Sequence, residues 1–100
     1  MCFTDDDCRP GPGWAEALVD RIAAGAAAVA GPTVNGHPDD PFATASQAVT
    51  NHLAAASRAP ANTPFAPTSN LAVRADVFSD VPFDETFPLA AGEDREWCDR

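Results

Sequence analysis

Residues 1–30, MCFTDDDCRPGPGWAEALVDRIAAGAAAVA, predict a strand, a helix and a second strand in that order. Residues 1–4 are typical of the end of a buried strand, and a polar loop rich in proline and glycine follows them. Residues 14–24 place large apolar side chains at helical spacing, and Gly25 is typical of the residue that ends a helix. Residues 26–30 have the length and apolarity of a short buried strand.

Prolines separate the elements expected in the rest of the chain. Asp40 followed by Pro41 predicts a helix start, because aspartate caps a first turn and proline fits its first position. This helix ends near Ser57, and one apolar face of it carries Phe42, Ala45, Val49, Leu53 and Ala56. The pattern then predicts a loop at 58–67, a strand at 69–74, a helical turn at 76–79, an irregular stretch at 83–87 and a helix from Gly92.

The charge balance excludes several classes of partner. The 100 residues include 15 acidic residues against six arginines and no lysine, which gives a net charge of −9. Proteins that bind nucleic acid need clustered cations, so we expect no nucleic-acid partner, and anionic lipid is disfavoured too. No stretch approaches the roughly 18 apolar residues that cross a bilayer. The start of the chain lacks the features of a signal peptide, so we expect a cytoplasmic protein without a membrane segment.

Three cysteines, Cys2, Cys8 and Cys98, form no closely spaced pair and predict free thiols. Both ends of the chain fall inside expected elements, because residues 1–4 belong to a strand and residues 92–100 stop after about two helical turns. We therefore expect residues 1–100 to be a partial domain that is truncated at both ends.

The most distinctive local feature is the run Thr4-Asp5-Asp6-Asp7 directly after the first strand. Consecutive carboxylates repel one another unless solvent or a hard cation screens them, and Mg²⁺ or Mn²⁺ binds such oxygens together with substrate phosphates. The carboxyl ends of strands in α/β sheets are also where ligands bind. An acidic loop that caps the helix beginning at Trp14 explains the run equally well.

A second group of acidic residues lies in Phe83-Asp84-Glu85 and in Gly92-Glu93-Asp94. Carboxylates in the first turn of a helix are kept ionised by the helix dipole and by backbone N–H groups, which is one way to position a general base. Simple capping of the helix is the commoner explanation of a Glu-Asp pair at this place.

Together these blocks resemble a family 2 glycosyltransferase of the GT-A fold. The resemblance covers the stretches TDDD, PGWAEALVD, AAVAGPTV, PTSNLAVRADVF and FDETFPLAAGEDREWCDR, in the family's order and at about its spacing. It implies an α/β, Rossmann-like domain with a mostly parallel sheet. Where the family usually has glycines before Phe-Asp-Glu, this chain has Val81-Pro82-Phe83, which changes the loop backbone without removing a catalytic group.

The resemblance also implies roles for individual residues. Asp5, Asp6 and Asp7 form the DxD-type motif that binds the nucleotide-sugar donor, with Asp5 and Asp7 holding Mg²⁺ or Mn²⁺ on its diphosphate. Asp94 is the catalytic base that takes the proton from an acceptor hydroxyl, so the reaction inverts the anomeric carbon, and Glu93 orients the acceptor. Two residues of the SN-x-x-x-R strand, Asn70 and Arg74, line the site or brace it.

The expected activity is metal-dependent sugar transfer from a nucleotide-sugar donor to an acceptor hydroxyl. About 30 residues per strand–helix unit imply that roughly 60 to 80 residues of the family's domain precede this piece, so we expect the hundred residues alone to have little or no activity. Two alternatives from other classes stay open. The chain is a non-enzymatic acidic module that binds a metal or a partner protein, or it is a truncated gene remnant.

Overall fold

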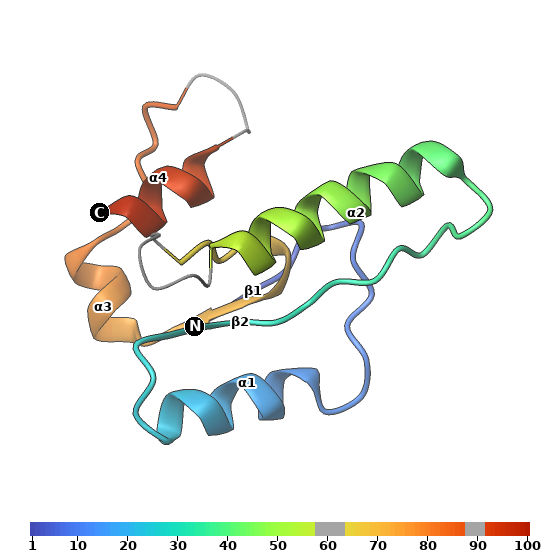
Figure 1. Cartoon of the computed structure of the whole chain (residues 1–100). Helices are drawn as coiled ribbons and strands as arrows, with labels where there is room; N and C mark the ends of the chain where they lie inside the picture. Colours follow the sequence, from blue (N-terminus) through green and yellow to red (C-terminus); the bar gives the residue numbers. More distant parts are fainter. Residues whose placement is uncertain (58–63, 88–91) are drawn as a thin grey trace.

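A computed structural model describes residues 1–57, 64–87 and 92–100 (Figure 1). The predicted loop at 58–67 lies partly outside these ranges, as do residues 88–91. In chain order the elements are β1 (Cys2–Phe3), α1 (Trp14–Ala23), β2 (Ala28–Ala30), α2 (Pro41–Ala56), the 3₁₀ turn η1 (Thr68–Asn70), β3 (Leu71–Val73), α3 (Ala75–Asp80) and α4 (Glu93–Asp99). The predicted order of strands and helices is therefore confirmed over the described ranges.

The three strands form one sheet in the order β1-β3-β2, and β3 runs antiparallel to both neighbours. Ala72 pairs with Cys2 on one side and with Val29 on the other. The α/β class is thus confirmed, but the expected mostly parallel, Rossmann-like sheet is wrong. β1 and β2 do run in the same direction, joined through α1, yet β3 lies between them. β3 begins where β2 ends, as the bond from Gly31 N to Asn70 O at 3.0 Å shows, and so must run the opposite way.

The core lies around β3, whose residues Leu71, Ala72 and Val73 are all buried. Trp97 of α4 packs against this strand and donates from Nε1 to the carbonyl of Val81 at 2.6 Å. Four aromatic rings extend the core, with centroids 5.4 to 5.7 Å apart in edge-to-face and tilted arrangements. These rings belong to Phe3, Phe78, Phe83 and Trp97.

The helix boundaries follow the expected local chemistry. The Asp40 carboxylate accepts the backbone N–H groups of Phe42 at 2.8 Å and Ala43 at 3.3 Å, which confirms the predicted cap of α2. Gly25 has φ +107°, a conformation that glycine adopts without strain, and it ends α1 as predicted. Gly92 likewise has φ +89° directly before α4.

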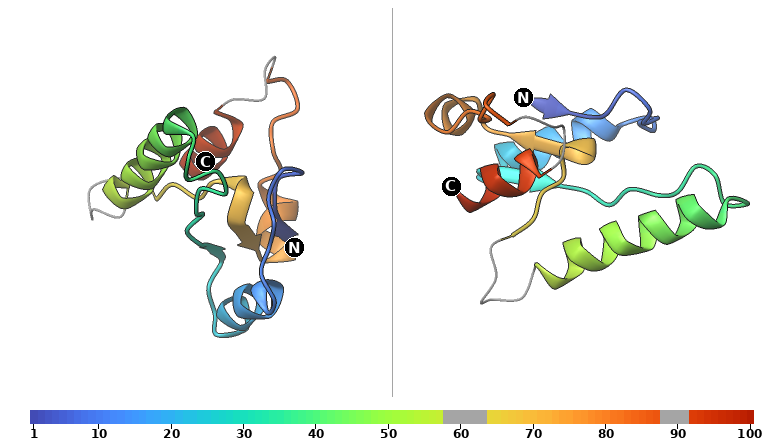
Figure 2. Two further views of the ribbon diagram at one scale, coloured as in Figure 1. Left: turned by 90° about the vertical axis from the view of Figure 1, so that its right-hand side faces the viewer. Right: turned by 90° about the horizontal axis from the view of Figure 1, so that it is seen from above.

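α1 and α2 lie on opposite sides of the strands (Figure 2). Within the described ranges, no helix combines the length and the apolarity needed to cross a bilayer. All three cysteines are free thiols, as predicted.

We predict that Phe83→Ala destabilises the fold, because this ring contacts Phe3, Phe78 and Trp97. Since Phe83 is only half-buried, the loss should be about 2 kcal/mol, below the roughly 3–5 kcal/mol of a fully buried phenylalanine. Urea unfolding followed by circular dichroism in dilute solution measures it. Phe42→Ala is the matched control, because that ring is exposed, and it should change stability by less than about 0.5 kcal/mol. Equal losses in the two variants would contradict the assignment of the core.

Candidate functional site

A cleft of about 680 Å³ opens between the loop after β1, the loop after β2 and α2. Its lining includes Asp5, Asp7, Cys8 and Arg9 from the first loop, Trp14 at the start of α1, Thr33 and His37 from the second loop, Gln47 and Thr50 from α2, and Asn70. Polar side chains hold these walls together, since Gln47 Nε2 donates to Thr33 Oγ1 at 2.9 Å. The cleft thus lies where β1 and β2 end, at the edge of the sheet at which the aspartate run was expected to act.

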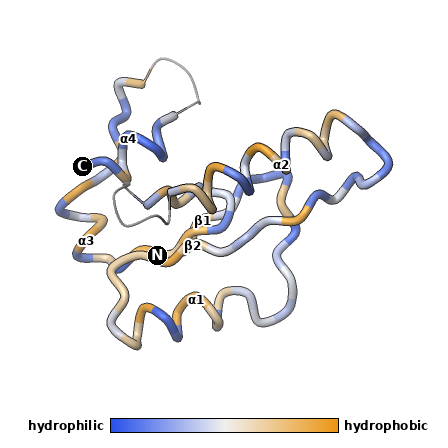
Figure 3. The backbone as a smooth tube through the Cα atoms, viewed as in Figure 1, coloured by the Kyte–Doolittle hydropathy of each residue, from blue (hydrophilic) through white to orange (hydrophobic). Residues whose placement is uncertain are grey.

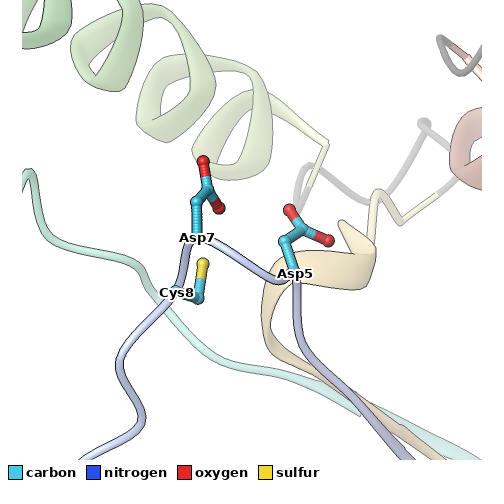
Figure 4. Close-up of side chains that lie close together, drawn as sticks. All are labelled: Asp5, Asp7 and Cys8. Atoms are coloured by element: carbon cyan, nitrogen blue, oxygen red, sulfur yellow. The ribbon is translucent and has the colours of Figure 1, made fainter.

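A turn at the end of β1 gathers Asp5, Asp7 and Cys8. The N–H of Cys8 donates to the carbonyl of Asp5 at 3.1 Å and closes the turn. One carboxylate oxygen of each aspartate and the sulfur of Cys8 all lie within 4.8 Å of one another. The three side chains project from the loop toward α2 (Figure 4). All three aspartates are exposed, and Asp6 does not belong to this group.

Negative charge accumulates around Asp5. Asp5 is exposed overall, but partial burial of its carboxyl raises its pKa above the ordinary value, and the charges of Asp7, Asp6 and Glu93 raise it further. Glu93 comes from the opposite end of the chain, and its charge makes the smallest of these contributions. Within residues 1–57, 64–87 and 92–100, neither ion pair includes Asp5, Asp7 or Glu93.

The start of α4 holds Glu93 and Asp94 beside the cleft rather than in its lining. Glu93 Oε2 is buried and has no hydrogen-bond partner among the described residues. Burial raises the pKa of Asp94, while the backbone N–H groups of Arg95 and Thr68 act in the opposite direction and the charge of Glu93 adds to the rise. The N–H of Arg95 donates to Asp94 Oδ1 at 2.8 Å. A half-buried carboxyl with a raised pKa is a chemically competent proton acceptor.

Asn70 connects three segments of the site. Its Oδ1 accepts the indole N–H of Trp14 at 2.9 Å, and its Nδ2 donates to the carbonyl of Pro32 at 2.9 Å. Its main-chain carbonyl also accepts the N–H of Gly31 at 3.0 Å. The side chain therefore fixes the start of α1 and the end of β2 relative to β3, while it also lines the cleft.

Arg74 lies at the opposite end of β3 from Asn70 and does not line the cleft. Its guanidinium forms two bonds with the carboxylate of Asp76, from Nε at 2.7 Å and from Nη2 at 2.8 Å. Among the predicted site residues, Arg74 is the one that the fold separates from the others.

Sequence reasoning did not single out several side chains of the cleft, among them Trp14, Thr33, His37 and Gln47. The available signal was the pair of glycine- and proline-rich stretches at 9–13 and 31–38, which follow β1 and β2 and so lie at the same edge of the sheet.

Comparison with models of protein families, with curated proteins and with solved structures finds no match to this chain.

We predict that Gly31→Ala destabilises the site, because a Cβ at this position would overlap the side-chain amide of Asn70, lying 2.9 Å from its Cγ. Asn70 is held by Trp14 and Pro32 and cannot yield without losing those bonds. We expect a loss of about 1–3 kcal/mol, the usual range for overpacking. Gly36→Ala is the control, because nothing lies within 4 Å of the corresponding Cβ. Thermal unfolding by circular dichroism compares the two, and a Gly31→Ala variant as stable as Gly36→Ala would disprove the close approach.

The raised pKa of Asp94 predicts a pH-dependent gain in stability for Asp94→Asn. A carboxyl whose pKa is raised by folding opposes folding above that pKa, and the cost disappears below the unfolded value of about 3.9. Asp94→Asn should therefore be more stable than the wild type at pH 7, and the gain should vanish as the pH falls below that value. Urea unfolding across this pH range measures it.

Asp84→Asn provides a control of opposite sign. Hydrogen bonds from the hydroxyl and the N–H of Thr86 lower the pKa of Asp84, so its charged form stabilises the fold. This variant should lose stability at pH 7 and recover relative to the wild type in acid. A loss of stability at pH 7 in Asp94→Asn as well would contradict the assigned cost of burying Asp94.

Proposed function

We propose that this chain carries the metal-binding and base-bearing part of a glycosyltransferase centre, which transfers a sugar from a nucleotide-sugar donor to an acceptor hydroxyl. The observation that carries the proposal is the aspartate turn beside the cleft, where ligand atoms of Asp5, Asp7 and Cys8 lie within 4.8 Å of one another. Asp94, from the second acidic motif, bonds the backbone of Thr68, which directly precedes the cleft residues Ser69 and Asn70. The cleft is large enough for part of a small-molecule substrate.

The aspartate turn fits a divalent cation. An Mg²⁺ ion holds oxygen ligands at about 2.0–2.1 Å, so two ligands of one ion are at most about 4.2 Å apart. The atoms of Asp5, Asp7 and Cys8 lie within 4.8 Å of one another, and small side-chain rotations bring the two carboxylates into range. A bound cation would also offset the mutual repulsion that raises the pKa of Asp5.

Each residue then has a chemical role. A divalent cation supplies Lewis-acid stabilisation of the leaving diphosphate. Asp5 and Asp7 hold that cation at the mouth of the cleft, and Asn70 braces the walls through Trp14 and Pro32. Asp94 accepts the proton of the acceptor hydroxyl, a task suited to its raised pKa. Glu93 orients the acceptor beside it.

Metal-dependent retention of a nucleotide tests the proposal on the chain itself. Equilibrium dialysis with uridine and guanosine diphosphates, with Mn²⁺ and then with EDTA, measures the nucleotide that the protein retains beyond the Mn²⁺–nucleotide complex in solution. We expect retention with Mn²⁺ and none with EDTA. Asp7→Asn should weaken retention at least about tenfold, the equivalent of one charged contact.

Asp6→Asn is the matched control, because it removes the same charge from the neighbouring position without touching the cluster. It should leave retention within about threefold of the wild type, since a charge outside the cluster acts only through screened, long-range interactions. Binding of Mn²⁺ or Ca²⁺ without any nucleotide retention would identify a simple acidic metal-binding module instead. Equal effects of the two variants would show that net charge alone matters.

A further inference from the structure

The helix α2 exposes its apolar stripe and turns its polar flank to the cleft. Phe42, Val49 and Leu53 are 85%, 60% and 50% exposed, and no residue of the helix is buried. On the opposite flank, Gln47 and Thr50 line the cleft. Figure 3 shows apolar segments along α2, and Figure 2 shows that most of this helix lies apart from the strands. Amphipathic helices normally bury such a stripe, so this orientation calls for an occupant from outside the fold.

The orientation follows from polar bonds. Gln47 donates to Thr33 Oγ1 at 2.9 Å, and Asn35 Nδ2 donates to Thr44 Oγ1 at 3.0 Å. Both bonds attach the helix to the loop after β2 through its polar flank. Rotating the stripe inward would break them and would place apolar side chains in the cleft.

The distribution of charge indicates which kind of partner can bind the apolar stripe of α2. The chain carries a net charge of −9, yet α2 contains no Asp, Glu, Lys or Arg over its 16 residues. A basic partner or an anionic membrane would find no matching charge on this helix. A second copy of the chain would be repelled at most other faces but can approach this uncharged one. An uncharged apolar surface therefore suits the stripe, and the same stripe on a second copy is such a surface.

The shape of the stripe is self-complementary. Bulky residues, Phe42 and Leu53, lie toward its two ends, and Ala45 lies between them. In an antiparallel pair related by a two-fold axis, Phe42 of one copy lies beside Leu53 of the other, and Ala45 lies beside Val49 near the axis. Such pairing is isologous, so it closes at two copies.

We propose that the α2 stripe, Phe42, Ala45, Val49 and Leu53, is a homodimer interface formed by antiparallel packing of two copies of α2. A 16-residue helix is about 24 Å long and about 10 Å across, so this contact buries less than the roughly 1,200 Å² of a stable complex. The dimer therefore dissociates on dilution. Because the cleft lies on the opposite flank of α2, it stays open in the dimer, and the proposal does not depend on the proposed function.

Sedimentation velocity from about 10 µM to about 1 mM tests the interface, a range that brackets a weak, reversible association. We expect a monomer at the low end and a dimer at the high end for the wild type. Val49→Glu places a carboxylate at the centre of the stripe and should raise the dissociation constant at least tenfold. Val19→Glu is the matched control, because Val19 is a valine on α1 with a similar exposure of 52%, and this variant should dimerise as the wild type does.

Circular dichroism verifies that both variants fold, and Phe42→Asp supplies a second disruption if Val49→Glu does not fold. A wild type that stays monomeric up to about 1 mM would overturn the proposal, as would equal weakening by Val49→Glu and Val19→Glu. Growth beyond the dimer would also overturn it, because it would mean non-closing aggregation. Binding of the monomer to vesicles of neutral phosphatidylcholine, without dimers, would assign the stripe to a lipid surface instead.

Discussion

The strand β3 is paired on both sides, with β1 through Leu71 and Ala72 and with β2 along its whole length. Because the strand is also buried, its backbone N–H and C=O groups cannot bond to water. Both neighbouring strands must therefore be in register to supply hydrogen-bond partners. That requirement fixes the ends of β1 and β2 at one edge of the sheet. The aspartate turn and the loop after β2 therefore face each other, and the cleft is the space between them.

The same edge collects more negative charge than the fold needs. The charges of Asp7, Asp6 and Glu93 help to raise the pKa of Asp5, while Arg74 and Arg100 are engaged with Asp76 and Glu96 elsewhere. Clustering of like charges is uncommon on purely structural surfaces, where opposite charges are interspersed. It is typical of sites where residues are kept for chemistry at the expense of stability. The buried Glu93 Oε2, unpartnered within the described ranges, belongs to the same pattern.

Local chemistry made the helices predictable. Asp40 and Pro41 predicted the start of α2, and the spacing of apolar residues from Trp14 onward predicted α1. Both signals depend only on residues that are close in sequence. The direction of β3 was not predictable in the same way. The sequence of a three-residue strand does not indicate whether it runs parallel or antiparallel to its neighbours. The direction of β3 depends on the end of the sheet to which α2 and the following loop bring the chain.

The candidate site shows the same division. The aspartate turn was recognisable because its residues are adjacent in sequence, and Glu93 with Asp94 because they share a helix start. The contribution of Trp14 to the cleft was not recognisable, because it depends on a hydrogen bond from its indole N–H to Asn70, a residue distant in sequence. Arg74 illustrates the converse, because its place in a motif suggested a site role while Asp76, two residues on, engages it. The stripe on α2 was read correctly as a shared face, but periodicity alone cannot tell whether such a face is covered.

The two tryptophans of the chain occupy unlike surroundings. Trp97 is buried against β3, whereas Trp14 sits at the wall of the cleft with its indole N–H bonded to Asn70. Indole emission depends on the polarity around the ring, so the molecule contains two intrinsic optical reporters. Trp97 responds to loss of the core, and Trp14 responds to a molecule that enters the cleft or disturbs its walls. Replacing Trp14 by phenylalanine leaves Trp97 fluorescence as a measure of core unfolding. Replacing Trp97 leaves Trp14 fluorescence as a measure of changes in the cleft, and neither variant needs an attached dye.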